Sequence, residues 1–287
     1  MTGSVERGLL LIGGGRMGEA LASGLRRHGR GGEIVVVEAL AARRAELGRA
    51  GLAVTASVEE GLAMLAGPPG PPVAQIGAVI AVKPHDVQAV ARDLVGGAGR
   101  GGPEGGLELT RVLSIAAGIT LGDLDAWLDP VPVLRAMPNT PALVGAAASA
   151  VAAGRRAGPA DVEWAKEVLA AVGTVVELPE AALDAVTGLS GSGPAYVFML
   201  AEALIDAGVL AGLARPVARD LAVQTLLGSA RLLAETGEEP ASLRAAVTSP
   251  GGTTAAGLRA LEVAGLRAAV LDAVMAATER ARELGRH

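Results

Sequence analysis

The chain has 287 residues and a formal net charge of −5, and just over half of its residues are apolar. This length predicts about two domains. The acidic charge, with only two Trp, one Tyr and one Phe, disfavours binding to a nucleic-acid backbone or stacking on bases. The absence of cysteine excludes disulfides, thiolate nucleophiles and cysteine metal sites.

Two apolar stretches bear on targeting. Residues 9–12 form an apolar run too short for the core of a signal peptide, and it leads directly into glycines. Residues 195–201 are apolar, but Glu202 and Asp206 interrupt the run before it reaches membrane-spanning length. We therefore expect a cytoplasmic protein with no membrane partner.

The first part of the chain alternates short β-branched runs with helical patterns. This alternation predicts βαβ units and a mostly parallel sheet, an α/β domain over residues 1–178. Expected strands are 9–12, 34–37, 52–54, 79–82, 112–115, 131–134, 148–152 and 174–178, and expected helices include 16–28, 86–95 and 160–171. The Gly/Pro-rich stretches 67–72 and 96–106 are expected to be surface insertions.

After residue 179 the pattern becomes helical throughout, which predicts an all-α domain over residues 179–287. The expected helices are 181–187, 194–210, 216–235, 243–247, 254–263 and 266–284. The helix over 194–210 is apolar nearly all round, so several of its faces must be buried. Because this domain is too small to cover all of those faces itself, we expect a partner subunit to cover one of them.

The strongest motif in the first domain is a glycine turn. Gly13, Gly15 and Gly18 form G-x-G-x-x-G between an expected strand and an expected helix. Such glycines allow a tight turn, close approach of a pyrophosphate and close packing of helix on strand. The pyrophosphate would lie on the helix N-terminus, where free N–H groups favour anions. The motif indicates a Rossmann-type domain that binds a nicotinamide dinucleotide; the alternative is a purely structural turn.

An acidic residue, Glu38, follows the second expected strand. A carboxylate at that point commonly binds the adenine-ribose hydroxyls of NAD and would repel the 2′-phosphate of NADP. Arg43 and Arg44 on the next helix could offset this repulsion, but we interpret them as a solvated helix face. Glu38 therefore predicts that NADH is a competent hydride donor.

Acid–base groups are scarce. The histidines are His28, His85 and His287, and the lysines are Lys83 and Lys166. We therefore expect neither a Ser-His-Asp triad nor a histidine–carboxylate metal site. This inventory favours chemistry that needs little help from side chains, such as hydride transfer to an already electrophilic C=N bond, with the cofactor supplying the difficult step.

Three further segments are candidates for binding. Lys83 and Pro84 follow an expected strand, where strand ends line a ligand crevice; the alternative is a solvated loop. The loop over 188–196 could be a site or a tightly packed helix start. In the loop over 248–254, consecutive glycines before a helix expose N–H groups suited to a carboxylate or phosphate; the alternative is a simple helix cap.

These motifs together resemble the pyrroline-5-carboxylate reductase family over essentially the whole chain. The matching segments are the Gly13–Gly18 turn, 81–84 (AVKP), 116–119 (AAGI), 135–141 (RAMPNTP), 191–196 (GSGPAY) and Leu243 with 248–254 (TSPGGTT). The resemblance implies reduction of L-1-pyrroline-5-carboxylate to L-proline, the last step of proline biosynthesis, with NADPH or NADH. It also implies an N-terminal Rossmann domain and an all-α dimerisation domain, in a homodimer or a larger assembly such as a ring of dimers.

The resemblance also implies roles for individual residues. The cofactor residues that it implies are Gly13, Gly15, Arg16, Met17, Gly18, Glu38, Ser57, Val82, Lys83, Pro84, Ala117 and Asn139, the last of these near the nicotinamide. The implied substrate residues are Glu235, Ser249, Gly251, Gly252, Thr253 and Thr254. Thr254 is expected to hydrogen-bond the ring nitrogen and relay its proton, and Glu235 is expected to come from the dimer partner.

Two departures from the family pattern and two rival functions bear on this interpretation. Ala246 stands where a polar residue is common, and Glu38 is not what an NADP-preferring member would show, so the coenzyme preference is left open. A β-hydroxyacid-type dehydrogenase would use a lysine in the helical half, and this half contains none. A non-catalytic dinucleotide sensor could keep every glycine loop.

Overall fold

The computed structural model describes residues 8–29, 33–66, 74–98 and 107–285. The chain divides into two compact units, one made of Met1–Gly191 with Ala277–His287 and the other of Ser192–Ala276. The Gly/Pro-rich stretch 67–72 and most of 96–106 lie outside the described residues, so their expected role as insertions stays a prediction.

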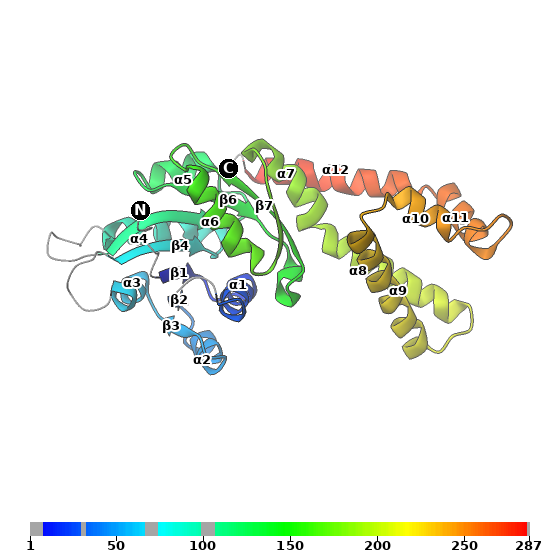
Figure 1. Cartoon of the computed structure of the whole chain (residues 1–287), viewed down its shortest axis with the longest axis horizontal. Helices are drawn as coiled ribbons and strands as arrows, with labels where there is room; N and C mark the ends of the chain where they lie inside the picture. Colours follow the sequence, from blue (N-terminus) through cyan, green and yellow to red (C-terminus); the bar gives the residue numbers. More distant parts are fainter. Residues whose placement is uncertain (1–7, 30–32, 67–73, 99–106, 286–287) are drawn as a thin grey trace. The chain divides into compact units, whose positions relative to one another are not determined.

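The first unit is built on an eight-stranded sheet in the order β3-β2-β1-β4-β5-β6-β7-β8 (Figure 1). All neighbouring strands run parallel except β6 and β7. The strands are β1 (Gly8–Ile12), β2 (Glu33–Val37), β3 (Ala53–Thr55), β4 (Ala74–Ile80), β5 (Leu107–Ser114), β6 (Val133–Met137), β7 (Ala147–Ala153) and β8 (Gly173–Glu177). The strand order reverses between β1 and β4, and in such sheets ligands bind at the carboxyl ends of strands beside that point.

Helices cover both faces of this sheet. Leu10 and Ile12 of β1 belong to one core cluster, and Leu9 and Leu11 to the other, because successive side chains of a strand point to opposite faces. The first cluster includes side chains of α3 (Val58–Ala66), α4 (Val87–Ala98) and α5 (Leu121–Trp127), and the second those of α1 (Arg16–Arg27), α2 (Ala41–Arg49) and α6 (Pro159–Ala170). Burial on both faces explains the continuous apolar runs of the strands.

The α/β class and the parallel character of the sheet are confirmed, while some element boundaries differ. Strand β4 begins at Ala74, well before the expected 79–82, and ends at Ile80. The sequence did not indicate the first part of this strand, because Gly77 interrupts the apolar run. The structure explains the glycine: the ring of Trp164 on α6 occupies the space that a Cβ at Gly77 would take. The expected helix 181–187 is a chain of short turns: η3 (Glu180–Ala182), α7 (Leu183–Val186) and the π-helical η4 (Thr187–Gly191).

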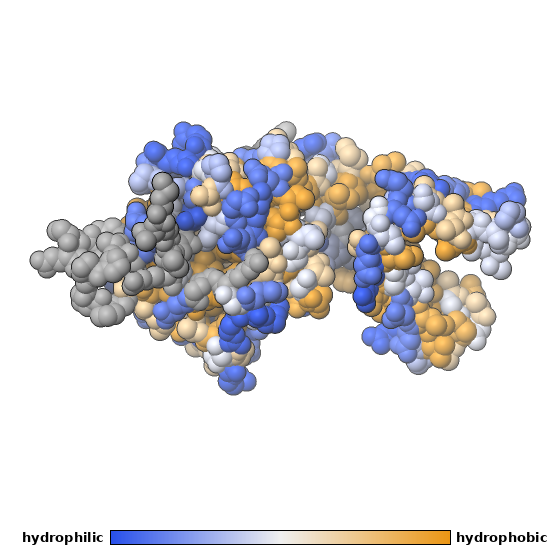
Figure 2. Space-filling view, in the orientation of Figure 1, coloured by the Kyte–Doolittle hydropathy of each residue, from blue (hydrophilic) through white to orange (hydrophobic). Residues whose placement is uncertain are grey.

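The second unit is helical. It contains α8 (Gly193–Leu210), α9 (Arg215–Thr236), α10 (Pro240–Ala246), α11 (Thr253–Val263) and the first part of α12 (Leu266–Leu284). Helix α8 buries none of its residues within the chain; Phe198 is 63% and Met199 71% exposed. Apolar surface is visible over the helices of this unit in Figure 2. By length and composition alone Glu180–Leu210 could cross a membrane. An apolar helix left uncovered by its own chain needs cover from another molecule.

Candidate active site

The glycine turn follows β1 directly. Gly13 donates its N–H to the carbonyl of Val37 at 2.8 Å and has a φ of 110°, a conformation that favours glycine. A Cβ at Gly18 would overlap the carbonyl oxygen of Gly13, whereas a Cβ at Gly15 would meet nothing within 4 Å. Helix α1 starts at Arg16 with Gly15 as its extended N-cap. The turn therefore packs tightly at two glycines and leaves open space at the third, which fits a pyrophosphate approaching the helix N-terminus.

Glu38 lies at the carboxyl end of β2, beside this turn. Its Oε2 accepts the Gly14 N–H at 3.0 Å, and its Oε1 accepts the Leu40 N–H at 2.8 Å. Ser57 lies after β3, where its Oγ accepts the N–H of Glu60 at 3.2 Å. The expected ribose-binding carboxylate is thus held by backbone donors at the edge of the sheet where the glycine turn lies.

The segments after β4 and β5 reach the same edge. The Ala81 N–H donates to Ile12 at 2.7 Å, which places Val82, Lys83 and Pro84 beside the end of β1. Lys83 and Pro84 are exposed, as is Ala117 after β5. Parallel strands thus bring the glycine turn, Glu38, Lys83 and Ala117 to one edge of the sheet, as the strand order requires.

Asn139 follows β6 and is buried, with 8% of its surface exposed. Its Oδ1 accepts the N–H of Ala148 at 2.9 Å, and its Nδ2 donates to the carbonyl of Ser190 at 2.9 Å. The amide therefore binds the backbone of β7 and of η4. This structural role was not expected from the sequence, which placed Asn139 near the nicotinamide.

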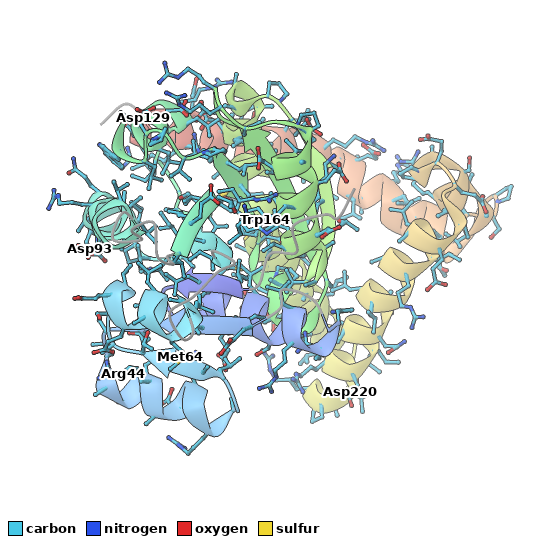
Figure 3. All side chains as sticks on the ribbon, turned by 60° about the vertical axis from the view of Figure 1, so that its left-hand side comes forward. Arg44, Met64, Asp93, Asp129, Trp164 and Asp220 are labelled. Atoms are coloured by element: carbon cyan, nitrogen blue, oxygen red, sulfur yellow. The ribbon has the colours of Figure 1, made fainter. Side chains whose placement is uncertain are left out.

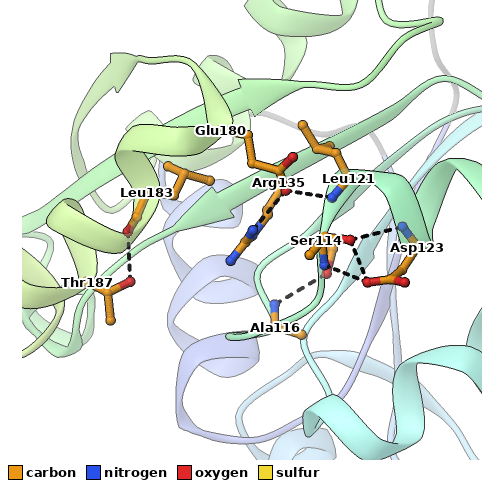
Figure 4. A network of polar contacts seen from close by, with 9 residues as sticks. Ser114, Ala116, Leu121, Asp123, Arg135, Glu180, Leu183 and Thr187 are labelled. Atoms are coloured by element: carbon orange, nitrogen blue, oxygen red, sulfur yellow. Dashed lines mark hydrogen bonds and ion pairs between the residues drawn. The ribbon is translucent and has the colours of Figure 1, made fainter. Parts of the chain in front are cut away.

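Figure 4 shows a polar network that the sequence reasoning missed. Arg135 of β6, with 12% of its side chain exposed, donates from Nη1 to Glu180 Oε1 at 2.8 Å. The same oxygen accepts the N–H of Leu121, the first residue of α5, at 2.7 Å. An arginine inside an otherwise apolar strand is the signal that could have indicated a paired carboxylate, because a buried charge needs a partner.

In the second unit, the segment before α11 forms a closed turn. Gly252 donates its N–H to the carbonyl of Ser249 at 3.0 Å, and Gly251 has a φ of 70°. Gly252 is the extended N-cap of α11, and Thr253 and Thr254 form its first turn, Thr254 being half-buried. The first N–H groups of a helix have no acceptor within it, so this turn presents donors suited to a carboxylate.

Glu235 lies near the end of α9, apart from this turn in the sequence. Its Oε1 accepts a hydrogen bond from Nε of Arg231, one helical turn earlier, at 3.1 Å, and its side chain is 65% exposed. The structure thus assembles the expected cofactor residues within the first unit and the Ser249–Thr254 turn within the second, while Glu235 pairs along its own helix.

Titratable groups add little to either assembly. Across the described residues, no three His, Asp or Glu side chains gather in a way that could hold a metal ion. His85 is 78% exposed and lies 3.4 Å from Asp86. The arrangement is therefore one of backbone N–H groups, hydroxyls and a tethered carboxylate, which suits binding and positioning more than proton abstraction.

Comparison with known proteins gives consistent matches. Residues 180–284 match the family model for pyrroline-5-carboxylate reductase dimerisation. A pyrroline-5-carboxylate reductase of Synechocystis is 43% identical over 287 residues, covering 99% of each chain. The structure of the Coxiella burnetii enzyme superposes with a TM-score of 0.85 at 32% identity, covering 98% of this chain and 99% of that one. That of the Plasmodium falciparum enzyme, with NADP bound, gives 0.78 at 27% identity, covering 99% and 100%.

Proposed function

This chain belongs to the pyrroline-5-carboxylate reductase family and reduces L-1-pyrroline-5-carboxylate to L-proline with NAD(P)H, and we propose that it does so by direct hydride transfer to the imine carbon. The observation that carries this mechanism is the turn before α11, which combines a row of backbone donors with the hydroxyl of Thr254. This turn suits a substrate that has both a carboxylate and a ring nitrogen.

In the proposed mechanism the helical unit holds the substrate. The N–H groups of Gly251 and Thr253 bind the carboxylate, with Ser249 as a further donor, while Gly252 closes the turn through its bond to the Ser249 carbonyl and lies against the substrate. Fixing the carboxylate orients the ring, and orientation removes much of the entropic part of the barrier. Glu235 is a further proposed substrate contact, contributed across the dimer once its pairing with Arg231 opens.

The proton balance needs one positioned hydroxyl. Reduction of a C=N bond adds a hydride to carbon and needs a proton on nitrogen. When bound, the reduced nicotinamide supplies the hydride. Thr254 donates its hydroxyl hydrogen toward the ring nitrogen and relays a proton from solvent, so that the imine is protonated when it is reduced.

The cofactor site is proposed at the carboxyl edge of the sheet in the first unit. Gly13, Gly15 and Gly18 fit a dinucleotide because a Cβ would find room only at Gly15, where the pyrophosphate approaches. Arg16 and Met17 add the first N–H groups of α1. The remaining proposed contacts are Glu38 at the ribose, Ser57, Val82, Lys83, Pro84 and Ala117 along the groove, and Asn139 near the nicotinamide.

The chain forms a homo-oligomer through its dimerisation segment. We infer that the functional division follows this segment, with a nucleotide-binding part over 1–178 and a substrate-binding, dimerising part over 179–287. The uncovered apolar side chains of α8, such as Phe198 and Met199, support a homodimer that buries them. A ring of dimers, a cytoplasmic location, and the absence of membrane and nucleic-acid partners complete the proposal.

The test is oxidation of NAD(P)H, followed by its absorbance, with pyrroline-5-carboxylate as substrate and proline measured as product. Thr254→Ala should lower kcat by a factor on the order of 10–100, because a positioned proton donor is lost, and Thr254→Ser should retain most activity. Thr225→Ala is the matched control, since that hydroxyl donates to the carbonyl of Leu221 within α9. A silent assay with folded protein would favour a dinucleotide sensor, and unchanged turnover of Thr254→Ala would remove Thr254 from the mechanism.

A further inference from the structure

The backbone of Gly14, in the middle of the glycine turn, is held on both sides of its Cα. Its N–H donates to Glu38 Oε2 at 3.0 Å, and its carbonyl accepts from Nε of Arg43 at 2.8 Å. A Cβ at Gly14 would lie 2.5 Å from Cδ1 of Leu47 and 3.0 Å from Glu38 Oε2. The turn is therefore clamped between a carboxylate at the end of β2 and a guanidinium on α2.

Arg43 uses its other nitrogens on two carboxylates. Nη2 donates to Glu19 of α1 at 2.6 Å, and Nη1 donates to Glu46 of α2 at 2.9 Å. The hydrogen bonds that Arg43 donates to Glu19 and, second, to Glu46 raise the pKa of Arg43 above its ordinary value. With 24% of its side chain exposed, Arg43 is not on a solvated helix face as the sequence suggested, but joins the glycine turn to both neighbouring helices.

The carboxylate of Glu38 is fixed in the same way. Each of its oxygens accepts one backbone N–H, from Gly14 and from Leu40. Arg44 donates from Nη1 to the carbonyls of Glu38 and Ala39, which holds the backbone at the same point. Glu38 can swing away from the end of β2 only by breaking two hydrogen bonds.

We propose that Glu38 and Arg43 act as a single clamp that positions the glycine turn and selects NADH over NADPH. This inference rests on the proposed function, in which the turn binds the coenzyme of the reductase. The 2′-phosphate of NADPH would place its negative charge beside the tethered carboxylate, which is repulsive at short range. Arg43 offers it little compensation, because its positive charge is already paired with the carboxylates of Glu19 and Glu46 and its Nε is bound to the carbonyl of Gly14.

Arg44 is a second cation near the end of β2. Figure 3 shows it beside Met64, and the two residues line a hollow together with Val54, Thr55, Ala56, Glu60 and Ala63. Glu60 accepts the N–H of Ala56 at 2.8 Å, so this hollow also contains a tethered carboxylate. Arg44 thus shares its hollow with a carboxylate, which repels a 2′-phosphate that approaches there.

The experiment measures Kd for NADH and NADPH by calorimetry, and kcat/KM for both coenzymes at saturating pyrroline-5-carboxylate. The wild-type chain should prefer NADH by roughly tenfold or more in both quantities. Glu38→Gln keeps one acceptor but removes the charge, so the preference should shrink severalfold. Equal or tighter binding of NADPH by the wild-type chain would overturn the inference, whether or not turnover is seen.

The variants of Arg43 separate positioning from general stability. Arg43→Ala should raise the KM of both coenzymes roughly tenfold while kcat and the KM for pyrroline-5-carboxylate change little. Arg43→Lys keeps the charge but carries its donors on a single nitrogen, which cannot reach all three separated acceptors, so it should show a smaller rise. This variant also keeps the test valid if the alanine variant does not fold. Arg49→Ala is the matched control, because among the described residues Arg49 donates to Ala45 on its own helix and not to the glycine turn.

The outcomes distinguish a failure of the Glu38–Arg43 clamp from a failure of the proposed function. An unchanged coenzyme KM in both Arg43 variants would overturn the positioning role, and so would a parallel fall in kcat. Tighter binding of NADH with no turnover of pyrroline-5-carboxylate would support the clamp and contradict the proposed function.

Discussion

Asn139 donates from its side-chain amide to the carbonyl of Ser190 at 2.9 Å, across 51 positions of sequence. The same amide accepts the N–H of Ala148 through Oδ1, so one buried side chain joins the end of β6 to the start of β7 and to the π-helical η4. Single π-helical turns are frequent at functional sites. The proposed nicotinamide contact of Asn139 therefore depends on a residue whose orientation the backbone already fixes.

Replacing this amide should destabilise the fold. Asn139→Ala leaves the half-buried N–H of Ala148 and the carbonyl of Ser190 without their partner, at a cost of about 1–3 kcal/mol in the free energy of unfolding. Urea unfolding at fixed protein concentration, as an oligomer requires, measures this loss. A change below about 0.5 kcal/mol would mean that neither hydrogen bond contributes to stability.

A second substitution, at Ser149 in β7, should not lower the free energy of unfolding. Ser149 of β7 is 4% exposed, and its Oγ has no hydrogen-bond partner among the described residues. A buried hydroxyl without a partner costs free energy, so Ser149→Ala should be neutral or should stabilise the chain by up to about 1 kcal/mol. The same urea titration checks this, and a clear destabilisation would show that the hydroxyl has a partner in solution.

The contact between Arg135 and Glu180 should show energetic coupling. Glu180→Gln weakens the acceptor for both Arg135 and the N–H of Leu121, and a destabilisation of about 1–3 kcal/mol is expected. A double-mutant cycle with Arg135→Met isolates the pair, and its coupling energy should exceed about 0.5 kcal/mol. Additive single effects would mean that the two side chains do not stabilise each other.

Two glycine substitutions should separate coenzyme binding from folding. Gly15→Ala adds a methyl group into open space, so the melting temperature should stay unchanged while the coenzyme KM rises, because the methyl group fills the approach of the pyrophosphate. Gly18→Ala places a methyl group on the carbonyl oxygen of Gly13 and should lower the melting temperature as well. Thermal melts without coenzyme, compared with steady-state kinetics, measure the difference. Equal effects of the two substitutions on stability would contradict the assignment.

Much of the fold could be predicted from local pattern, because the parallel strands are short apolar runs separated by amphipathic helices. The antiparallel direction of β7 was not predicted. Its sequence from Ala147 to Ala153 is rich in alanine, which says little about strand pairing. The evidence lay in its connection, since the few residues between Met137 and Ala147 form only the short turn η2 (Thr140–Val144) and leave no room for a crossover helix.

Site residues on glycine-rich turns were predictable because their roles follow from backbone geometry. The partners of charged side chains were not. Arg43 and Gly14, like Arg135 and Glu180, meet only when distant segments pack together, and residue spacing does not encode such contacts. The sequence offered one indication for each pair. Arg43 follows the glycine turn and its strand closely enough to reach them, and Arg135 lies within an apolar strand that had to be buried.

The most direct test of the mechanism follows deuterium from the coenzyme into the product. With NADH deuterated at the transferable position of the nicotinamide ring, direct hydride transfer predicts proline that carries a single deuterium on the former imine carbon. The same reaction run with unlabelled NADH in heavy water should leave that carbon unlabelled. Loss of the label to solvent, or its uptake from heavy water at that carbon, would contradict direct transfer of hydride to the imine.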